Sequence, residues 1–295
     1  MSQSKVAWNT PGHDLAFYDY AEHKLISGAQ VTQLPPWLSG EFALPFAAKV
    51  PGDSMANVFF GRLEDTRFRF GKKIEDVVER SDWGWTYRYA KSGEWKTETD
   101  QWLWDWDMPV ITDVNHDGFD EQIAYRVRTK EWLLGPFQRL YGPSAEPNDL
   151  PIPLAGRFLN TSNADLGLWI LGKGTISLQS LNTGQKVTFT WANHGGDILV
   201  NGDYDGDGYD EIAVYQRPDH TWHWRHAPDG RISDATFGTP TSLPLPADYN
   251  HDGKLDLAYW EPSQQKIFVS YSHGRTIDLV VNVPPHSIPA FVNMY

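Results

Sequence analysis

Short apolar runs recur along the chain and alternate with clusters of Asp, Asn, Gly and Pro. The clearest runs follow acidic segments and read Gln-Ile-Ala-Tyr at 122–125, Ile-Ala-Val-Tyr at 212–215 and Leu-Ala-Tyr-Trp at 257–260. Runs of this length, rich in branched and aromatic residues and bounded by turn-forming residues, are typical of β-strands. We therefore expect an all-β chain in which tight turns join short strands.

The pattern of strand and turn repeats along the chain. The equivalent position of each repeat falls at Asp14, Asn57, Glu121, Leu166, Glu211 and Asp256, with spacings of 43, 64, 45, 45 and 45 residues. Self-similarity with a period of 40 to 50 residues is typical of β-propellers and solenoids. The one long spacing indicates an insertion in the second repeat, at about residues 62–82. The continuous repeat predicts that residues 1–295 form a single domain.

The C-terminal segment indicates how the repeats close on themselves. Residues Ser287 to Asn293 match Ser242 to Asp248, 45 residues earlier, and supply a strand that the first repeat lacks on its N-terminal side. The C-terminal strand is therefore expected to pair with the first repeat. The predicted fold is a six-bladed β-propeller with four strands in each blade, and closure removes the exposed edges that an open array would present.

Three acidic loops share one pattern, with oxygen-bearing side chains at the first, third, fifth and ninth positions and Gly at the sixth. Ca²⁺ binds six to eight oxygens from carboxylates, amides, backbone carbonyls and water. The predicted side-chain ligands are Asp113, Asn115, Asp117 and Glu121; Asp203, Asp205, Asp207 and Glu211; and Asp248, Asn250, Asp252 and Asp256. The predicted carbonyl ligands at the seventh position belong to Phe119, Tyr209 and Lys254. About three bound Ca²⁺ ions are expected.

Two other interpretations apply to loops of this composition. An EF-hand would place a bidentate Glu at the twelfth position, where the sequence has Ala124, Val214 and Tyr259. A solvated turn without metal stays open, because Asp, Asn and Gly favour turns by themselves, but three loops in register favour calcium. The loop through Asn160 and Ser162 has only uncharged oxygens and is expected to hold no ion.

The segments from Gly202 to Tyr215 and from Ala247 to Tyr259 resemble the FG-GAP/VCBS repeat family of secreted bacterial proteins and integrin α-subunit heads. The resemblance is strong over residues 109–272 and weak over 1–70. It implies a calcium-stabilised extracellular β-propeller used for adhesion or carbohydrate contact, and sometimes as the scaffold of a polysaccharide-degrading enzyme. Such repeats specify fold and metal better than they specify function.

Charge and composition narrow the possible partners. The net charge of −13 disfavours nucleic acid and anionic membranes, and no apolar run is long enough to cross a bilayer. There is no cysteine, so neither disulfides nor thiol chemistry is available. The N-terminal residues show no signal peptide. The resemblance favours a secreted protein, although another export route or an intracellular location stays open.

Aromatic residues supply the candidate contacts for a glycan. Trp102, Trp104 and Trp106 alternate, so a strand would place all three indoles on one face. Packing between blades is the favoured role of these indoles, and stacking on sugar rings is the alternative. His220, His223 and His226 lie close together in sequence but do not converge on one face, so a metal site formed by these three imidazoles is not expected.

No catalytic motif is present in the sequence. Pairs such as Asp105 and Asp107, or Glu94 and Glu98, could supply the two carboxylates of a glycosidase, but acidic surfaces commonly contain such pairs. The sequence therefore favours a calcium-stabilised extracellular module that binds carbohydrate or a cell-surface protein. A polysaccharide lyase or glycoside hydrolase built on a propeller, and a purely structural scaffold, are the alternatives.

Overall fold

The computed structural model describes residues 16–33, 44–48, 57–64, 82–88, 95–98 and 107–290, with short gaps at 23, 28–29, 118–120, 136–137, 192–196, 251 and 272–275. This described part of the chain is all-β and contains no helix. Its strands form six antiparallel sheets of four strands each. The expected all-β class and the four-stranded unit are thus confirmed.

Each sheet is formed by strands that are consecutive in the chain, except for the first sheet. The first contains β24 (Ser287–Ala290), β1 (Ala16–Asp19), β2 (Lys24–Ser27) and β3 (Gln30–Gln33). The second contains β4 (Leu44–Ala48), β5 (Asn57–Glu64), β6 (Asp82–Arg88) and β7 (Trp95–Glu98). The third contains β8 (Asp107–Thr112), β9 (Glu121–Arg126), β10 (Glu131–Leu134) and β11 (Gln138–Leu140).

The remaining three sheets follow the same order. The fourth contains β12 (Pro151–Gly156), β13 (Asp165–Ile170), β14 (Thr175–Ser180) and β15 (Lys186–Thr190). The fifth contains β16 (Asp197–Leu199), β17 (Ile212–Gln216), β18 (Thr221–Arg225) and β19 (Ile232–Thr236). The sixth contains β20 (Leu243–Pro244), β21 (Leu257–Glu261), β22 (Lys266–Ser270) and β23 (Leu279–Asn282).

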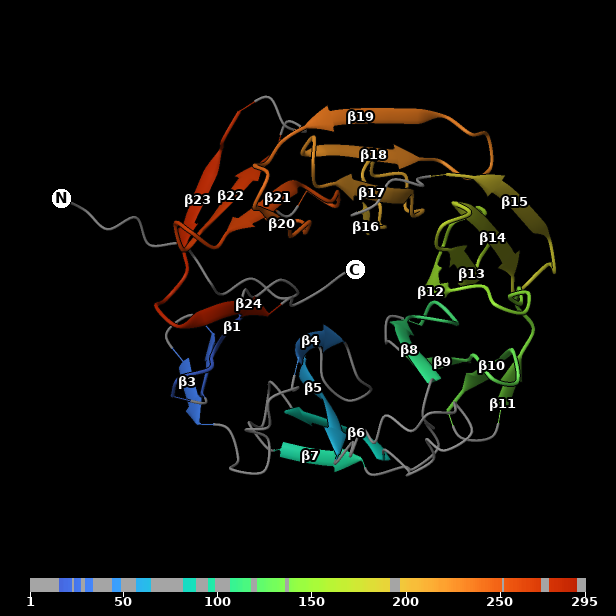
Figure 1. The fold of residues 1–295 in the computed structure, drawn as a ribbon, viewed down its shortest axis with the longest axis horizontal. Coiled ribbons are helices and arrows are strands. Elements are labelled where there is room, and N and C mark those ends of the chain that lie inside the picture. Colours follow the sequence, from blue (N-terminus) through green and yellow to red (C-terminus); the bar gives the residue numbers. More distant parts are fainter. Residues whose placement is uncertain are drawn as a thin grey trace.

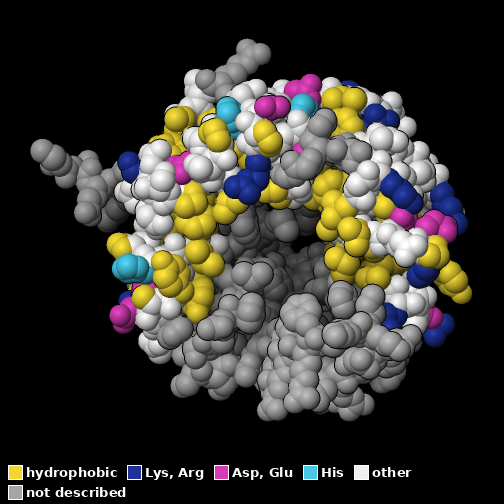
Figure 2. Space-filling model, viewed as in Figure 1, with side chains coloured by type: hydrophobic (Ala, Val, Ile, Leu, Met, Phe, Trp, Pro, Cys, Tyr) yellow, Lys and Arg dark blue, Asp and Glu magenta, His cyan; other side chains and the backbone are white. Residues whose placement is uncertain are grey.

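The sheets are arranged around a common centre in chain order, with the first strand of each sheet nearest the centre (Figure 1). Inner strands of neighbouring sheets contact one another, as β8 contacts β12 and β24 contacts β4. Figure 2 shows a central hollow in the same view, with hydrophobic side chains gathered along the described part of its wall. Loops that join first to second strands therefore lie near the centre of the molecule.

The innermost strand of the first sheet comes from the C-terminal region. β24 pairs antiparallel with β1, and the register runs from Ala16 opposite Ala290 to Asp19 opposite Ser287. The expected pairing of the C-terminal strand with the first repeat is confirmed. The last residues of the matching segment, 291–295, lie outside the described residues.

The insertion expected at about residues 62–82 falls between and within two strands of the second sheet. β5 and β6 remain paired as far as Glu64 opposite Asp82, so both ends of the stretch predicted as an insertion are strand. These strands, of 8 and 7 residues, are longer than the corresponding strands of the other sheets. Residues 65–81, between them, lie outside the described residues.

Aromatic pairs fill the core within and between the sheets. In the fifth sheet, Tyr215 and Trp222 face each other with ring centroids 4.9 Å apart, and both are fully buried. The third sheet repeats this pair with Tyr125 and Trp132 at 5.1 Å. Each indole N–H donates to a backbone carbonyl, at 2.7 Å from Trp222 to Phe237 and 2.8 Å from Trp132 to Pro143. Burial therefore leaves neither of these two indole N–H groups without a partner.

Candidate metal loops

The three acidic loops occupy the same place in their sheets, between the first and second strands. Loop 113–121 joins β8 to β9, loop 203–211 joins β16 to β17, and loop 248–256 joins β20 to β21. In each loop the ninth residue pairs across the turn with the residue that precedes the loop. These pairs are Thr112 with Glu121, Gly202 with Glu211 and Ala247 with Asp256.

A common set of hydrogen bonds holds the ninth side chain against the turn. Its carboxylate accepts the backbone N–H of the second loop residue. The distances are 2.8 Å from Val114 to Glu121, 2.9 Å from Tyr204 to Glu211 and 2.8 Å from Tyr249 to Asp256. The ninth carboxylate is thus fixed beside the first residue, as a cage around one ion requires.

The first carboxylate accepts backbone N–H groups from the middle of the loop. Gly206 and Gly208 donate to the two oxygens of Asp203 at 2.6 and 2.8 Å. Gly208 has a φ of 84°, and its counterpart Gly253 has 87°. This left-handed conformation is one that glycine adopts without steric cost, which explains the glycine at the sixth position.

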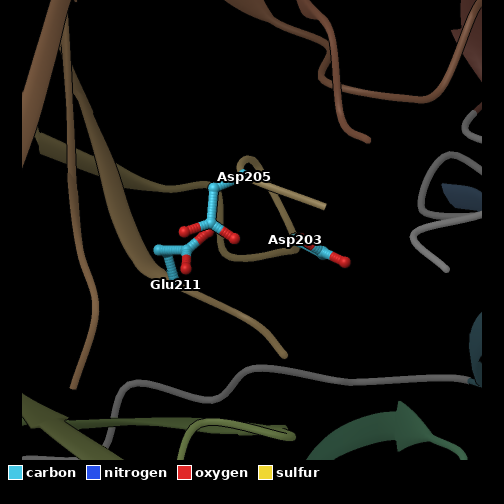
Figure 3. Close-up of side chains that lie close together, drawn as sticks. All are labelled: Asp203, Asp205 and Glu211. Carbon is cyan, nitrogen blue, oxygen red and sulfur yellow. The ribbon is translucent and has the colours of Figure 1, made fainter. Parts of the chain in front are cut away.

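Loop 203–211 brings three carboxylates together. One oxygen from each of Asp203, Asp205 and Glu211 lies within 4.8 Å of the others (Figure 3). Glu211 is 1% exposed, and its Oε1 is buried without a hydrogen-bond partner among the described residues. Burial and the nearby carboxylates of Asp205, Asp203 and Asp207 raise the pKa of Glu211 to about 8. A hard cation suits this all-oxygen cluster with its unpartnered buried oxygen.

The fifth residue of this loop does not join the cluster. Asp207 uses Oδ1 to accept the N–H of Tyr209 at 2.9 Å, and its Oδ2 lies 3.8 Å from Nε2 of His226. Asp205, inside the cluster, also pairs with Nη2 of Arg231 at 2.6 Å. The hairpin that supplies His226 and Arg231 was not predicted to approach the loop, because only the tertiary fold brings it there.

The other two acidic loops share the hydrogen bonds but not the clustering. Within the described residues, loop 203–211 alone gathers three acidic or imidazole ligands. In loop 248–256, burial and the carboxylates of Asp252 and Asp248 raise the pKa of Asp256 to about 7, while Asn250 donates to Asp252 at 3.1 Å. In loop 113–121, Asn115 donates to Glu121 at 3.4 Å, and Phe119 lies outside the described residues.

The fourth sheet contains a degenerate loop at 157–165. Gly156 pairs with Asp165 across its turn, as Gly202 pairs with Glu211. The structural equivalent of Glu211 is therefore Asp165, one residue before the Leu166 expected from the 45-residue spacing. This loop therefore begins one residue earlier than the 45-residue period predicts. The shift is visible in the pairing of Gly156 with Asp165 but not in the sequence period.

Hydroxyl groups satisfy the buried carboxylate of the degenerate loop. Asp165 is fully buried and accepts the N–H of Leu159 at 2.7 Å and the hydroxyl of Thr161 at 3.1 Å. Ser180 donates in turn to the Thr161 hydroxyl at 3.2 Å. Burial raises the pKa of Asp165. Neutral donors thus occupy the role that a cation fills in a metal loop.

Backbone hydrogen bonds connect the four loops from one sheet to the next. The residue before the ninth position donates its N–H to a carbonyl at the start of the preceding loop. These bonds run from Ala164 to Val114 at 3.1 Å, from Asp210 to Arg157 at 2.9 Å and from Leu255 to Asp203 at 2.8 Å. The guanidinium of Arg157 also lies 4.5 Å above the ring of Tyr209. The loops consequently form one continuous chain of contacts near the centre.

The remaining sequence candidates have mixed outcomes. Trp102, Trp104 and Trp106 lie outside the described residues. Asp107 is 4% exposed and pairs with Arg126 at 2.9 Å, so this carboxylate is engaged in a buried ion pair within the third sheet. Asp105, the other member of the glycosidase pair proposed from the sequence, lies outside the described residues, so that pair stays a prediction.

Comparison with known proteins bears on both the fold and the acidic loops. Residues 203–272 match the model of the FG-GAP-like repeat. This segment is therefore similar to FG-GAP-like repeats. It contains loops 203–211 and 248–256, and it confirms the resemblance over those residues. A search of curated proteins gave no match.

Solved structures were also compared with this chain. A lectin of Agrocybe aegerita, described as specifically recognising non-reducing terminal N-acetylglucosamine, superposes with a TM-score of 0.55. It is 10% identical, over 95% of this chain and 78% of the lectin chain. BBS1N, solved in complex with ARL6DN, gives a TM-score of 0.48 at 8% identity, over 93% and 77% of the two chains. At 10% identity the likeness to the lectin bears on fold alone. No helix of the described residues is long and apolar enough to span a membrane.

Proposed function

We propose that this protein is a calcium-stabilised extracellular binding module that recognises a glycan. Its six sheets are the blades of a closed β-propeller, and the acidic loops hold Ca²⁺ beside the central hollow. The observation that carries the proposal is the cluster of Asp203, Asp205 and Glu211, in which Oε1 of Glu211 is buried without a partner in the described structure.

Electrostatics explain why this cluster needs a cation. A buried ionised carboxylate is costly unless a charge or hydrogen bonds compensate it. The backbone N–H of Tyr204 satisfies only Oε2 of Glu211, and the nearest charges include other carboxylates. A Ca²⁺ ion coordinated by all three residues would offset this repulsion. Because protein oxygens would fill most of its shell, the ion is a structural clamp in this proposal, whereas catalytic metals keep an open position.

Two observations support glycan recognition. The structurally similar lectin is described as recognising N-acetylglucosamine, and the chain is rich in indoles, with 14 Trp. We retain Trp102, Trp104 and Trp106 as the proposed contacts, since planar rings stack on the apolar faces of sugars. Calcium would act indirectly by keeping the central loops in place.

Calcium titration by isothermal calorimetry tests the metal part of the proposal. We expect about three sites in the wild-type protein, and Glu211→Gln should remove the one in loop 203–211. Asp219→Asn, which changes an exposed carboxylate in the β17–β18 turn, is the matched control and should bind as the wild type does. Absence of any calcium binding by the wild type contradicts the proposal.

A glycan array, run with calcium and with EDTA, tests recognition. We expect binding to glycans with exposed terminal sugars, lost on Trp104→Ala and weakened in EDTA only as far as the fold loosens. A calcium-saturated, folded protein that binds no glycan rules out the glycan proposal and favours a cell-surface protein as the partner.

A further inference from the structure

The geometry points to a second metal site beside loop 203–211, for a divalent transition-metal ion such as Zn²⁺, with His226 and Asp207 as its protein ligands. This site is distinct from the proposed calcium cluster. It does not depend on calcium binding, because neither the imidazole nor the fifth carboxylate belongs to the three-carboxylate cluster.

His226 carries the inference because its ring is buried and one nitrogen has no partner. The residue is 7% exposed, and Nε2 is buried without a hydrogen bond among the described residues. Oδ2 of Asp207 lies 3.8 Å from Nε2. This distance is too long for a hydrogen bond. It is close to the separation of two ligands that share one ion, with Zn–N and Zn–O bonds of about 2.1 Å.

The other ring nitrogen is oriented as metal-binding histidines usually are. Nδ1 lies 2.8 Å from Oδ1 of Asp229. Because a carboxylate only accepts hydrogen bonds, Nδ1 carries the proton, and in the neutral ring Nε2 then keeps a lone pair that a metal ion can use. A carboxylate bound to the distal nitrogen is the arrangement that fixes the tautomer of a metal ligand and raises its basicity.

The backbone places this imidazole firmly. His226 follows β18 in the turn before β19, where its N–H donates to Arg231 at 2.9 Å and its carbonyl accepts the N–H of Gly230 at 2.9 Å. The same turn is docked on the acidic loop by the ion pair of Arg231 with Asp205. The ligand pair is thus held between two anchored segments, and the half-exposed side of Asp207 is open to an ion and its waters.

Imidazole and carboxylate together favour zinc, copper or nickel over calcium. Calcium prefers oxygen ligands alone, whereas imidazole suits first-row transition metals. The three histidines of this hairpin do not meet, since His223 pairs with Asp234. His226 instead meets an acidic loop that is distant in sequence. With two protein ligands and water completing the shell, the site would bind zinc reversibly.

Zinc titration in saturating Ca²⁺ tests the site, measured by isothermal calorimetry. We expect one Zn²⁺ in the wild type, no binding at this site in His226→Gln or Asp207→Asn, and about tenfold weaker binding in Asp229→Asn, the usual cost of losing an outer partner. His223→Gln removes a neighbouring imidazole of the same hairpin and should bind zinc as the wild type does. Asp207→Asn keeps the test decisive if His226→Gln fails to fold, because Asp207 is far more exposed.

The inference is overturned if Asp207→Asn or folded His226→Gln retains full zinc binding, or if the wild type binds none. In that case, His226 is a protonated imidazole that only bridges the carboxylates of Asp207 and Asp229. Displacement of zinc by excess calcium also overturns it, since the two ions would then share one cage. Calcium titration of the same samples keeps the zinc site separate from the proposed function. A protein that binds zinc but no calcium refutes only the proposed calcium-stabilised function. A protein that binds calcium but no zinc refutes only the zinc site.

Discussion

At the scale of single residues, the acidic loops depend on how each carboxylate is compensated. Glu211 and Asp165 hold equivalent places in neighbouring sheets, and both are buried. Glu211 has one carboxylate oxygen without a hydrogen-bond partner among the described residues. Asp165 accepts a hydrogen bond from the hydroxyl of Thr161. One loop is therefore suited to a cation and the other is complete with neutral donors.

We predict that the calcium-free protein loses stability as pH rises, partly through Glu211. Burial raises its pKa from 4.5 to about 8. A raised folded pKa contributes stability that is complete below the unfolded value and lost as pH passes the folded one. In EDTA, the melting temperature of the wild type should fall as the pH is raised from about 5 to about 8. The melting temperature of Glu211→Gln should fall less over the same range. Identical profiles for the two proteins contradict this account.

Thr161→Val tests the hydroxyl of the degenerate loop. The change should cost about 1–3 kcal/mol, because Asp165 loses a donor inside the fold, and it should leave calcium stoichiometry unchanged. Thr188→Val removes a more exposed hydroxyl on β15 and serves as the control in urea denaturation. Equal stability of both variants would show that Thr161 does not compensate Asp165.

At the scale of elements, the loops were predictable singly but not as a set. The spacing of oxygen side chains around glycine predicted the turns between first and second strands, because those signals are local. The role of Asp165, the absence of Asp207 from the carboxylate cluster and the hydrogen bonds between loops depend on strand register and on neighbouring sheets. A 45-residue period does not record a shift of one residue, and no local pattern places His226 beside Asp207.

Gly206 reports on contact between adjacent loops. Its φ is 80°, and a Cβ at this position would approach Cε of Lys254 to 2.7 Å, whereas a Cβ on Gly208, at φ 84°, would meet nothing within 4 Å. Both alanine variants bear similar backbone strain. We expect Gly206→Ala to lower the melting temperature more than Gly208→Ala.

Lys254→Ala supplies the double-variant control for this contact. In its background the two glycine substitutions should cost nearly the same, since the side chain that meets the new methyl is gone. A difference that persists in the Lys254→Ala background would place its origin elsewhere in loop 203–211.

At the scale of the whole molecule, calcium should stabilise the entire ring of sheets. A ligand that binds only the folded state adds about 2.7 kcal/mol at a hundredfold excess over its Kd, and the loops connect four consecutive sheets by hydrogen bonds. We predict that EDTA lowers the melting temperature markedly and that Asp205→Ala in calcium lowers it less. An unchanged melting temperature in EDTA, measured by calorimetry, would contradict the structural role.

The pairing of β24 with β1 also sets an order for folding during synthesis. Strands β8 to β23 make their four sheets from consecutive segments, so each can assemble as it leaves the ribosome. The first sheet must wait, because its inner strand is the last of the described strands to be made. Until then β1 presents an unpaired edge that could capture strands of other chains. The residues of β24, which complete the first sheet, thus also end the period in which the edge of β1 exposes a nascent molecule to aggregation.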